Sequence, residues 1–385
     1  MAKKKNDEPK VYKEHPSVDQ RITDTLRENY MPYAMSVIVS RAIPEIDGFK
    51  PSHRKLLYTM YKMSLLNGNR TKSANIVGQT MKLNPHGDAA IYETMVRLTR
   101  GNEALLTPFV DSKGNFGKVY SRDMAYAAPR YTEAKLDGIC AELFRDIDTD
   151  AVDFVDNYDG EMKEPTLLPT TFPNILVSAN TGIAVGMASN FCGFNLEEVC
   201  RTTIECIRNP EHDILSTMPA PDFTTGGELI YDESEMRAIY ESGRGSFKVR
   251  AKWQYDKKEN LIEVTEIPYT MIGAGINKFL MDVADLVESK KLTDVTDISN
   301  QSNKEGIRIV LELKKDADVN KIKAILYKKT KLEDTYGVNM LAIDEGRPET
   351  MNLKQILNTF LEFQYRNMTK KYNVLLEKEL EKKLG

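Results

Sequence analysis

Between residues 18 and 40, apolar side chains recur at steps of three and four. They keep to one face: Ile22, Leu26, Tyr30, Tyr33, Val37 and Ile38. This spacing predicts a helix, and Pro44 with the Asp47–Gly48 turn ends it. Residues 1–17 are polar, and we expect a disordered tail there.

Residues 51–100 predict short helices joined by tight turns. One apolar stripe contains Leu56, Leu57, Met60 and Tyr61. Residues 65–69 form a turn, and helices are predicted over 73–82 and 88–98, separated by residues 84–87. Residues 101–135 read as loop and short strands. Helices and tight turns with positive charge are typical of a winged-helix or helix-turn-helix DNA-binding module.

Beyond about residue 140, segments with strand and helix periodicity alternate. Residues 247–255 alternate apolar and polar positions, and 261–264 predict the returning strand of a hairpin. A helix is expected at 273–290, a strand at 307–313 and another helix at 318–330. The fold class expected for the chain is therefore α+β.

Residues 351–384 contain neither glycine nor proline and predict one long helix. A helix of this length extends about 50 Å. Its second half is rich in lysine and glutamate, which is typical of one arm of a coiled coil. An unpaired arm would leave its apolar stripe exposed, so we expect the chain to end inside a longer coiled coil.

Composition changes this picture at few points. The chain has 385 residues, which favours two or more domains. No run of about 18 apolar residues predicts a membrane span, and the basic start lacks the apolar stretch of a secretory signal. The net charge is −4, yet residues 41–75 carry seven Lys or Arg and two acidic residues, a net +5. This segment is either an anion-binding face or a solvated helix face.

Three kinds of site are not expected. Four cysteines without a Cys-x-x-Cys pair do not favour zinc. Residues 114–118 have the wrong spacing for a nucleotide phosphate loop. The acidic run Asp146–Asp150 could begin a calcium loop, but Ala151 and Asn157 occupy the positions that require glycine and glutamate. An exposed acidic turn is the better interpretation.

The segment Ala127–Glu133, sequence AAPRYTE, resembles the active-site segment of type IIA DNA topoisomerase A subunits, the family of gyrase A and topoisomerase IV A. In that family an Arg-Tyr pair ends a glycine-rich loop and a helix follows. Further segments resemble the family in the same order: 33–39, 41–44, 50–55, 85–88, 153–160, 173–177 and 182–188.

The resemblance implies that Tyr131 is the nucleophile and that Arg130 assists it. A phenol has a pKa near 10 and needs activation at neutral pH. An arginine beside it stabilises a phenolate or the charge that builds on a phosphate. Attack on a DNA phosphate gives a phosphotyrosyl ester, attached in this family to the 5′ phosphate, and releases a deoxyribose hydroxyl. Without the motif, Tyr131 would read as one of 18 ordinary tyrosines.

The same resemblance assigns other residues to the DNA. Arg41, His53, Arg54 and His86 correspond to residues around the scissile phosphate, and Lys50 to the DNA-contacting surface. The alternative for His53 and His86 is a capping or core role. Ile183 corresponds to an isoleucine that wedges between base pairs, although its pattern alone indicates a buried strand residue.

The chain also departs from the family. Asn84 stands where many relatives have histidine, residues 46–48 are one residue shorter than usual, and residues 191–195 differ from a Pro-Pro-His pattern. Ala89 stands where relatives often have a serine that contacts quinolone drugs, whereas Glu93 keeps the acidic partner.

The architecture implied is an N-terminal arm with a winged-helix DNA-gate domain (18–140), an α+β tower domain (141–345) and the start of a coiled coil (346–385). The function implied is ATP-dependent double-strand DNA breakage and rejoining by a cytoplasmic, nucleoid-associated homodimer. A B subunit would complete an A2B2 complex and supply the Mg²⁺ site and the ATPase. The alternatives are a non-cleaving winged-helix DNA-binding scaffold and a tyrosine recombinase, which needs no B subunit.

Because Ala89 lacks the serine hydroxyl, we predict reduced quinolone sensitivity. The Ala89→Ser variant should accumulate more quinolone-induced cleaved DNA than the parent chain at equal drug concentration. Unchanged drug-induced cleavage in Ala89→Ser would refute this prediction.

Overall fold

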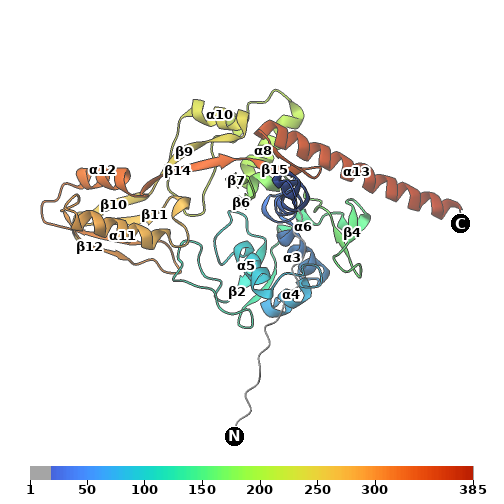
Figure 1. Cartoon of the computed structure of the whole chain (residues 1–385), viewed down its shortest axis with the longest axis horizontal. Helices are drawn as coiled ribbons and strands as arrows, with labels where there is room; N and C mark the ends of the chain where they lie inside the picture. The colour runs from blue at the N-terminus through green and yellow to red at the C-terminus, as the bar shows by residue number, and fades with distance from the viewer. Residues whose placement is uncertain (1–18, 385) are drawn as a thin grey trace, which may run out of the picture.

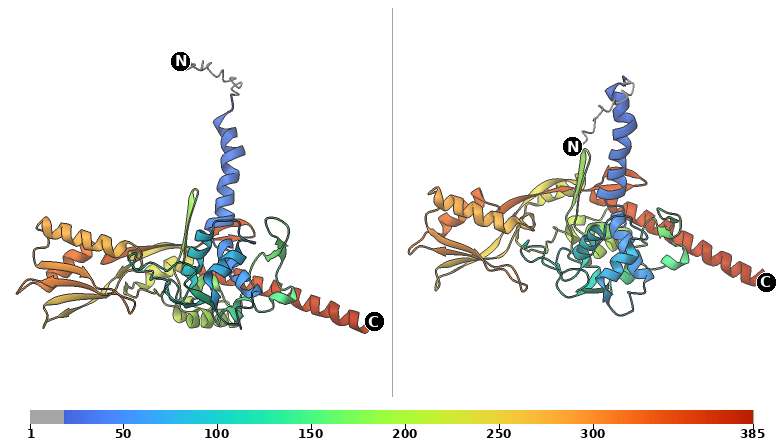
Figure 2. Two further views of the ribbon diagram at one scale, coloured as in Figure 1. Left: turned by 90° about the horizontal axis from the view of Figure 1, so that it is seen from below. Right: turned by 60° about the horizontal axis from the view of Figure 1, so that its bottom comes forward.

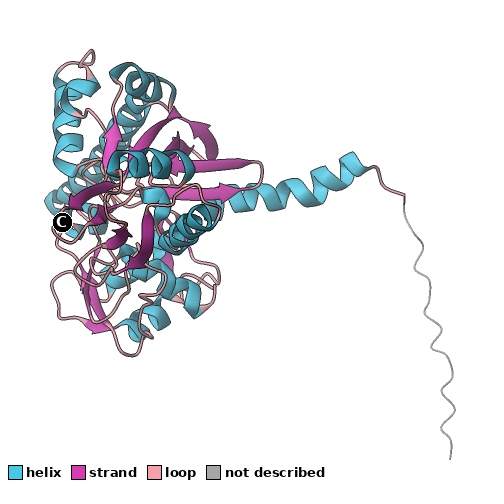
Figure 3. Cartoon of the chain, turned by 90° about the vertical axis from the view of Figure 1, so that its left-hand side faces the viewer, coloured by secondary structure: helices cyan, strands magenta, loops and turns pink. Residues whose placement is uncertain are grey.

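The computed structural model describes residues 19–384, so the disordered tail predicted at 1–17 lies outside the described residues. The chain begins with a helix that projects from the body (Figures 2 and 3). Its successive parts are α1 (Ile22–Thr25), η1 (Leu26–Tyr30), α2 (Met31–Val37) and η2 (Ile38–Ala42). The predicted helix is confirmed, but most of its apolar face is exposed. Only its base, near Ile38 and Ala42, is anchored, against Ile43, Leu341 and Ile343.

Three helices and a small sheet follow, as the pattern of residues 51–135 predicts. The elements are α3 (Pro51–Lys62), β1 (Thr71–Lys72), α4 (Ser73–Thr80), α5 (Asp88–Leu98), β2 (Val110–Lys113) and β3 (Glu133–Leu136). Proline at the first position of α3 suits a helix start, because that position needs no N–H donor. The sheet has the order β1-β3-β2 and is antiparallel.

The element that follows Tyr131 differs from the expectation. The resemblance implied a helix, but the chain enters β3, and the next helix, α6 (Cys140–Leu143), comes later. Residues 133–136 alternate, with Ala134 and Leu136 buried. This period of two favours a strand, and both neighbours, β1 and β2, pair with it.

A five-stranded sheet of order β6-β7-β14-β9-β8 forms the centre of the body. Its strands are β6 (Asn180–Ala184), β7 (Met187–Phe191), β8 (Glu228–Ile230), β9 (Arg244–Arg250) and β14 (Glu333–Asn339). The remaining elements of this part of the chain are η3 (Ile147–Thr149), β4 (Phe154–Asp156), β5 (Lys163–Pro165), α7 (Asn174–Val177), α8 (Leu196–Arg208), α9 (Ile214–Thr217), α10 (Glu233–Ser242), β15 (Leu341–Asp344) and β16 (Arg347–Thr350).

A second sheet lies at one end of the molecule, at the left of Figure 1, with two helices. Its order is β10-β11-β13-β12, and the paired strands are antiparallel. The elements are β10 (Lys252–Asp256), β11 (Leu261–Glu266), η4 (Tyr269–Met271), α11 (Gly275–Glu288), β12 (Val295–Asn300), β13 (Ile309–Leu313) and α12 (Val319–Lys329). The hairpin, strand and two helices predicted here are present, but the alternating run 247–255 is divided. Residues 247–250 belong to β9 of the five-stranded sheet, and only Lys252–Asp256 forms the hairpin strand β10.

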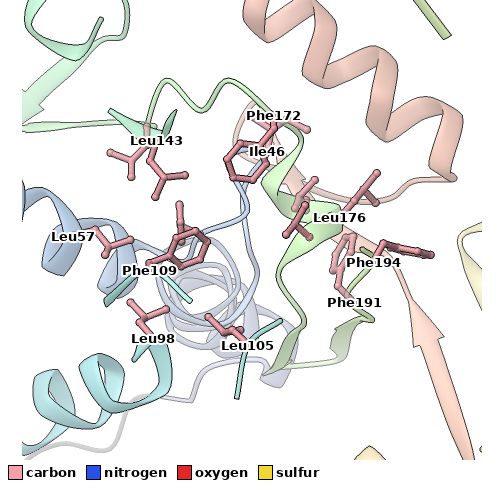
Figure 4. Close-up of a cluster of buried hydrophobic side chains, with 14 of the residues drawn as sticks. Ile46, Leu57, Leu98, Leu105, Phe109, Leu143, Phe172, Leu176, Phe191 and Phe194 are labelled. Carbon is pink, nitrogen blue, oxygen red and sulfur yellow. The ribbon is translucent and has the colours of Figure 1, made fainter. Parts of the chain in front are cut away.

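The hydrophobic clusters show how these parts are joined. The larger cluster contains buried residues from Ile46 to Phe363 and joins α3–α5 to the five-stranded sheet; Figure 4 shows Phe109 and Leu176 within it. The second cluster consists of buried hydrophobic residues between Ala251 and Leu332, together with Tyr120. The clusters do not divide at residue 140, where the sequence predicted a domain boundary, because the elements after 140 pack on α3–α5. The named domain division remains a prediction.

The last helix, α13 (Leu353–Leu384), has 32 residues and extends away from the body (Figure 1). One face of its first part is buried, through Leu353, Ile356, Leu357, Phe360 and Phe363. Beyond that point apolar residues are exposed, among them Tyr372, Leu376 and Leu380. The predicted long helix is confirmed, and its pairing into a coiled coil remains a prediction. No helix within residues 19–384 is long and apolar enough to cross a bilayer.

A buried ion pair fixes the start of α3. Arg54 Nε lies 2.7 Å from Asp47 Oδ2, and Arg54 Nη2 lies 2.6 Å from Glu45 Oε2. Burial alone would lower the pKa of Arg54, but the charges and hydrogen bonds of Asp47 and Glu45 raise it above its ordinary value. Asp47 also accepts hydrogen bonds from the backbone N–H groups of Phe49 (3.1 Å) and Leu168 (2.9 Å).

We predict that Arg54→Ala lowers the free energy of unfolding by about 3–5 kcal/mol, because it leaves Asp47 charged and buried without its partner. The control is Arg237→Ala, which breaks the exposed pairs with Asp213 and Glu233 and should lower the free energy of unfolding far less. Denaturant unfolding of both variants measures the difference. Equal costs would contradict the role of the buried pair.

Candidate active site and DNA-binding surface

The backbone around Tyr131 is held firmly, while its side chain is free. Tyr131 N–H donates to Ala128 O at 2.9 Å, and the first residues of α4 bind both flanks, with Ala74 N–H donating to Pro129 O (3.1 Å) and Ser73 N–H to Thr132 O (2.9 Å). The Tyr131 side chain is 64% exposed. The phenol therefore stands at the surface on a fixed base, where a large substrate can reach it.

Three buried hydroxyl groups, those of Thr132, Ser73 and Tyr92, hold the backbone beneath Tyr131. Thr132 is fully buried, and its Oγ1 lies 2.7 Å from Ser73 Oγ and 2.9 Å from Tyr92 OH. Tyr92 OH also donates to Ala127 O at 2.8 Å. These bonds tie the segment before and after Tyr131 to α4 and α5, so the two helices together set the position of the phenol.

Arg130 lies beside the phenol. Its guanidinium carbon is 4.6 Å from the centre of the Tyr131 ring, and both side chains are exposed. A cation at this distance interacts with the ring face. A guanidinium can also form charge-assisted hydrogen bonds with a negatively charged oxygen nearby.

Arg41 and His86 line one cavity of about 290 Å³ together with Ser52, Lys55 and Asn84. The cavity lies between the end of the N-terminal helix, the start of α3 and the loop before α5. Tyr131 is not among the residues that line it, so Tyr131 and this basic cavity lie in separate positions within one copy of the chain.

Lys55 in this cavity was not singled out from the sequence, although it belongs to the segment 50–55 that resembles the family. Its Nζ donates to Leu83 O at 3.0 Å and lies 3.4 Å from Glu164 Oε1. Lys55 lies one helical turn after Pro51 and therefore on the same face of α3. This spacing could have indicated that both residues line the same site.

A second basic group lies beneath the β6–β7 hairpin. Lys50 Nζ donates to Thr181 O at 2.8 Å, and Arg97 Nη2 donates to Ala179 O at 3.0 Å. Burial, with the charge of Arg97, lowers the pKa of Lys50 to about 8. No ion pair of Lys50 or Arg97 with a carboxylate occurs within residues 19–384. Such a cluster of positive charge is suited to bind an anion. Arg97 was missed in the sequence because it reads as an ordinary cation in the last turn of a helix.

His53 lies in the same group and is only 9% exposed. Burial, followed by the charges of Arg97, Lys50 and Arg54, lowers the pKa of His53 to about 3. The ring is therefore neutral at physiological pH. This geometry fits the core alternative considered for His53 better than a charged contact to DNA.

Arg54 does not present its guanidinium at the surface. The side chain is 6% exposed and is occupied by Asp47 and Glu45. The expectation that Arg54 lies at the scissile phosphate is therefore corrected: as a buried cation it needs its carboxylate partners, and its role in this structure is to hold the start of α3.

Ile183 is 81% exposed near the tip of the β6–β7 hairpin, which projects beside the N-terminal helix in Figure 2. The buried strand position that its pattern indicated is wrong. The hairpin is seated closely, because a Cβ at Gly182 would lie 1.8 Å from Ala42 O. Only glycine allows this approach, and it leaves the neighbouring isoleucine directed to solvent.

Ala89 lines a cavity of about 400 Å³ with Ala74, Met81 and Tyr126. Glu93 is exposed on α5 and accepts a hydrogen bond of 3.4 Å from Tyr126 OH. Both residues therefore lie on the side of α5 that faces the segment leading to Tyr131. Whether a drug binds there remains a prediction.

Comparison with known proteins decides the family. Residues 41–384 match the family described as the A subunit of DNA gyrase/topoisomerase IV. The chain belongs to this family. It is 46% identical over 367 residues to the DNA gyrase A subunit of Clostridium acetobutylicum, covering 93% of this chain and 43% of that protein.

Two other members of the family give similar values. The DNA gyrase A subunit of Halalkalibacterium halodurans is 43% identical, covering 89% of this chain and 41% of the relative. The corresponding gyrase protein of Staphylococcus epidermidis is 42% identical, covering 90% and 39%. The chain thus spans about two fifths of the length of these curated relatives.

The low pKa of His53 predicts a pH dependence of stability. The unfolded chain takes up a proton at His53 below about pH 6.5, whereas the folded chain does so only near pH 3. As the pH falls from about 6.5 toward 3, the free energy of unfolding should therefore decrease, and His53 contributes up to about 1.4 kcal/mol per pH unit to this decrease.

The His53→Gln variant is neutral at every pH and should lose this part of the slope. Denaturant unfolding of both proteins between pH 7 and pH 4 measures the difference. His86→Gln, at an exposed position, is the matched control and should keep the slope. If the free energy of unfolding changed with pH at the same slope in the parent chain and in His53→Gln, His53 would not be buried as a neutral ring.

Proposed function

We propose that this chain is the DNA-cleaving part of a gyrase A or topoisomerase IV A protein, which breaks and rejoins double-stranded DNA through Tyr131. The observation that carries the proposal is the exposed phenol on a fixed backbone with the Arg130 guanidinium beside it. Membership of the family supports it.

In the proposed reaction the Tyr131 oxygen attacks a DNA phosphorus. The phenol proton leaves to a base, the new O–P bond forms, and the bond from phosphorus to the 3′ oxygen breaks. That oxygen takes up a proton, and the 5′ phosphate stays on Tyr131. One phosphate ester replaces another, so the 3′ hydroxyl can reverse the step. Arg130 offsets the negative charge that builds during attack.

The basic groups support DNA as the substrate. The phosphate backbone supplies the anion that Lys50 and Arg97 lack within the described residues. Lys50 donates to Thr181 O in the hairpin that carries Ile183, and Arg97 donates to Ala179 O just before it. We infer that phosphate binding there places Ile183 against the base stack, where an apolar wedge bends the duplex.

A homodimer completes the proposed site. Arg41, Lys55 and His86 share a cavity that Tyr131 does not line. We infer that Tyr131 of one copy reaches a phosphate held at this cavity of the other copy. Two such composite sites cut opposite strands. The exposed apolar residues of α13 beyond Phe363 are the expected coiled-coil contact.

We also propose that a B subunit supplies the Mg²⁺ site and the ATPase in an A2B2 complex. Within the described part of the chain, no group of three or more His, Cys, Asp or Glu side chains could hold a metal ion. The chain's own residues bind and orient the DNA and provide the nucleophile.

The nucleophile is tested with 5′-labelled duplex DNA, Mg²⁺ and a matching B subunit, with detergent to trap the covalent adduct. We predict that Tyr131→Phe lowers the adduct at least about a thousandfold, because phenylalanine has no attacking oxygen. The control is Tyr158→Phe, which alters a tyrosine of similar exposure (58%) and should leave the adduct unchanged.

An adduct that persists in Tyr131→Phe would assign the attack to another residue. An adduct that forms without the B subunit would favour a recombinase. If the parent chain with its coiled coil completed gave no adduct, the non-cleaving DNA-binding scaffold would replace the proposal.

A further inference from the structure

The segment 117–126, which we call the strap, precedes Tyr131 but is bound to the second sheet. Its residue Tyr120 is 3% exposed and belongs to the cluster formed by residues 251–332. Tyr120 OH donates to Asn303 O at 2.7 Å, in the turn between β12 and β13. Burial, with the charge of Glu103, raises the pKa of Tyr120 to about 12, so its hydroxyl keeps the proton that it donates.

Three more bonds join the strap to the region around α11. Gly273 N–H donates to Val119 O at 2.8 Å, and Arg122 N–H donates to Gly273 O at 3.2 Å. Asn277 Nδ2 donates to Asp123 Oδ2 at 3.2 Å. Together with Tyr120, they attach the middle of the strap to the second sheet and its helix.

The two ends of the strap are hydrogen-bonded to each other. Lys118 N–H donates to Met124 O at 3.3 Å. Asn115 binds the end of the strap and the residue that follows it. Its side-chain Nδ2 donates to Ala125 O (3.0 Å), and its backbone carbonyl accepts from Ala127 N–H (2.8 Å). Gly117 permits this closure: its φ is +66°, and a Cβ there would lie 2.6 Å from Met124 O. These bonds connect the middle of the strap to Ala127, four residues before Tyr131.

The strap contacts α5 at its end, where Tyr126 OH donates to Glu93 Oε1 at 3.4 Å and the Tyr126 ring lies 5.4 Å from the ring of Tyr92. Nearer its middle, a cavity of about 330 Å³ is lined by Arg97 of α5, by Arg122 of the strap and by Gly273. The middle of the strap is held by the second sheet, by the region around α11 and, at Val119, by a bond from its N–H to Asn102 O at 2.9 Å. A change in the position of that sheet has a continuous bonded route to the nucleophile.

We propose that Tyr120 is a positioning residue, which couples the location of the β10–β13 sheet to the location of Tyr131. The proposal rests on the proposed function for its consequence in catalysis, but the coupling itself is a property of the free protein. When the second sheet moves, the strap carries the displacement to the segment 127–131. Through this route, the second sheet adjusts the alignment of the phenol with the scissile phosphate.

Hydrogen exchange of the free protein tests the coupling without any activity. Tyr120→Phe keeps the buried ring and removes the bond to Asn303 O. We expect the backbone amides of Ala127 and Tyr131 to exchange roughly three- to tenfold faster. Asn277→Ala, which removes the bond to Asp123, should change the same amides in the same direction. The control is Tyr255→Phe, which loses a similar bond to Asn260 Oδ1 (2.7 Å) within the second sheet, and it should leave both amides unchanged.

The adduct assay then tests the consequence. With the full-length chain, DNA and a B subunit, Tyr120→Phe should lower the trapped adduct by roughly three- to tenfold while DNA affinity stays within about twofold. Equal exchange rates in Tyr120→Phe, Asn277→Ala and the parent chain would overturn the coupling. An equal fall in Tyr255→Phe would also overturn it, since that result reflects general loosening. An adduct that survives Tyr131→Phe instead refutes the proposed function and leaves the exchange result to decide the coupling.

Discussion

The pair of Arg54 and Asp47 is the constraint on which the rest of the site depends. Asp47 is fully buried and binds the side chain of Arg54 and the backbone of Phe49 and Leu168. It therefore joins the turn before α3, the helix itself and the segment leading to α7. This joint fixes the first turn of α3, which carries Lys50 at one end and Lys55 at the other. Two buried charges are costly unless both are satisfied, so the arrangement has few alternatives and the basic cavity beside it keeps its shape.

The site combines a rigid base with exposed chemical groups. Tyr131 and Ile183 are among the most exposed large side chains of the described residues, yet each stands next to a tightly held backbone: Thr132 is fully buried, and Gly182 contacts Ala42. The proposed substrate, a DNA duplex, is too large to enter a pocket, so the reactive contacts have to project from the protein. In the proposed complex, fixing the backbone below each contact limits the freedom that is lost on binding.

Sequence reasoning predicted the local elements well, because their periodicity is a property of neighbouring residues. The helices at 51–62, 73–80 and 88–98 and the hairpin at 252–266 follow from that pattern. Sequence reasoning was weaker where contacts between distant segments determine the environment of a side chain. Arg54 looked like a DNA ligand, because its partner Asp47 was read only as part of a turn. Ile183 looked buried, because the projection of its hairpin depends on Ala42. Tyr120 gave no signal, since its partner Asn303 lies 183 residues away.

The central claim is that Tyr131 forms the bond to DNA, and the most direct measurement is to locate that bond. The trapped adduct would be digested with nuclease and trypsin, and the peptides analysed by mass spectrometry. Cleavage after Arg130 and Lys135 yields the peptide of residues 131–135, in which Thr132 is the other hydroxyl and is fully buried. The account predicts a nucleotide attached to this peptide at Tyr131 through a 5′ phosphate. A nucleotide on any other peptide, or one attached through a 3′ phosphate, would contradict it.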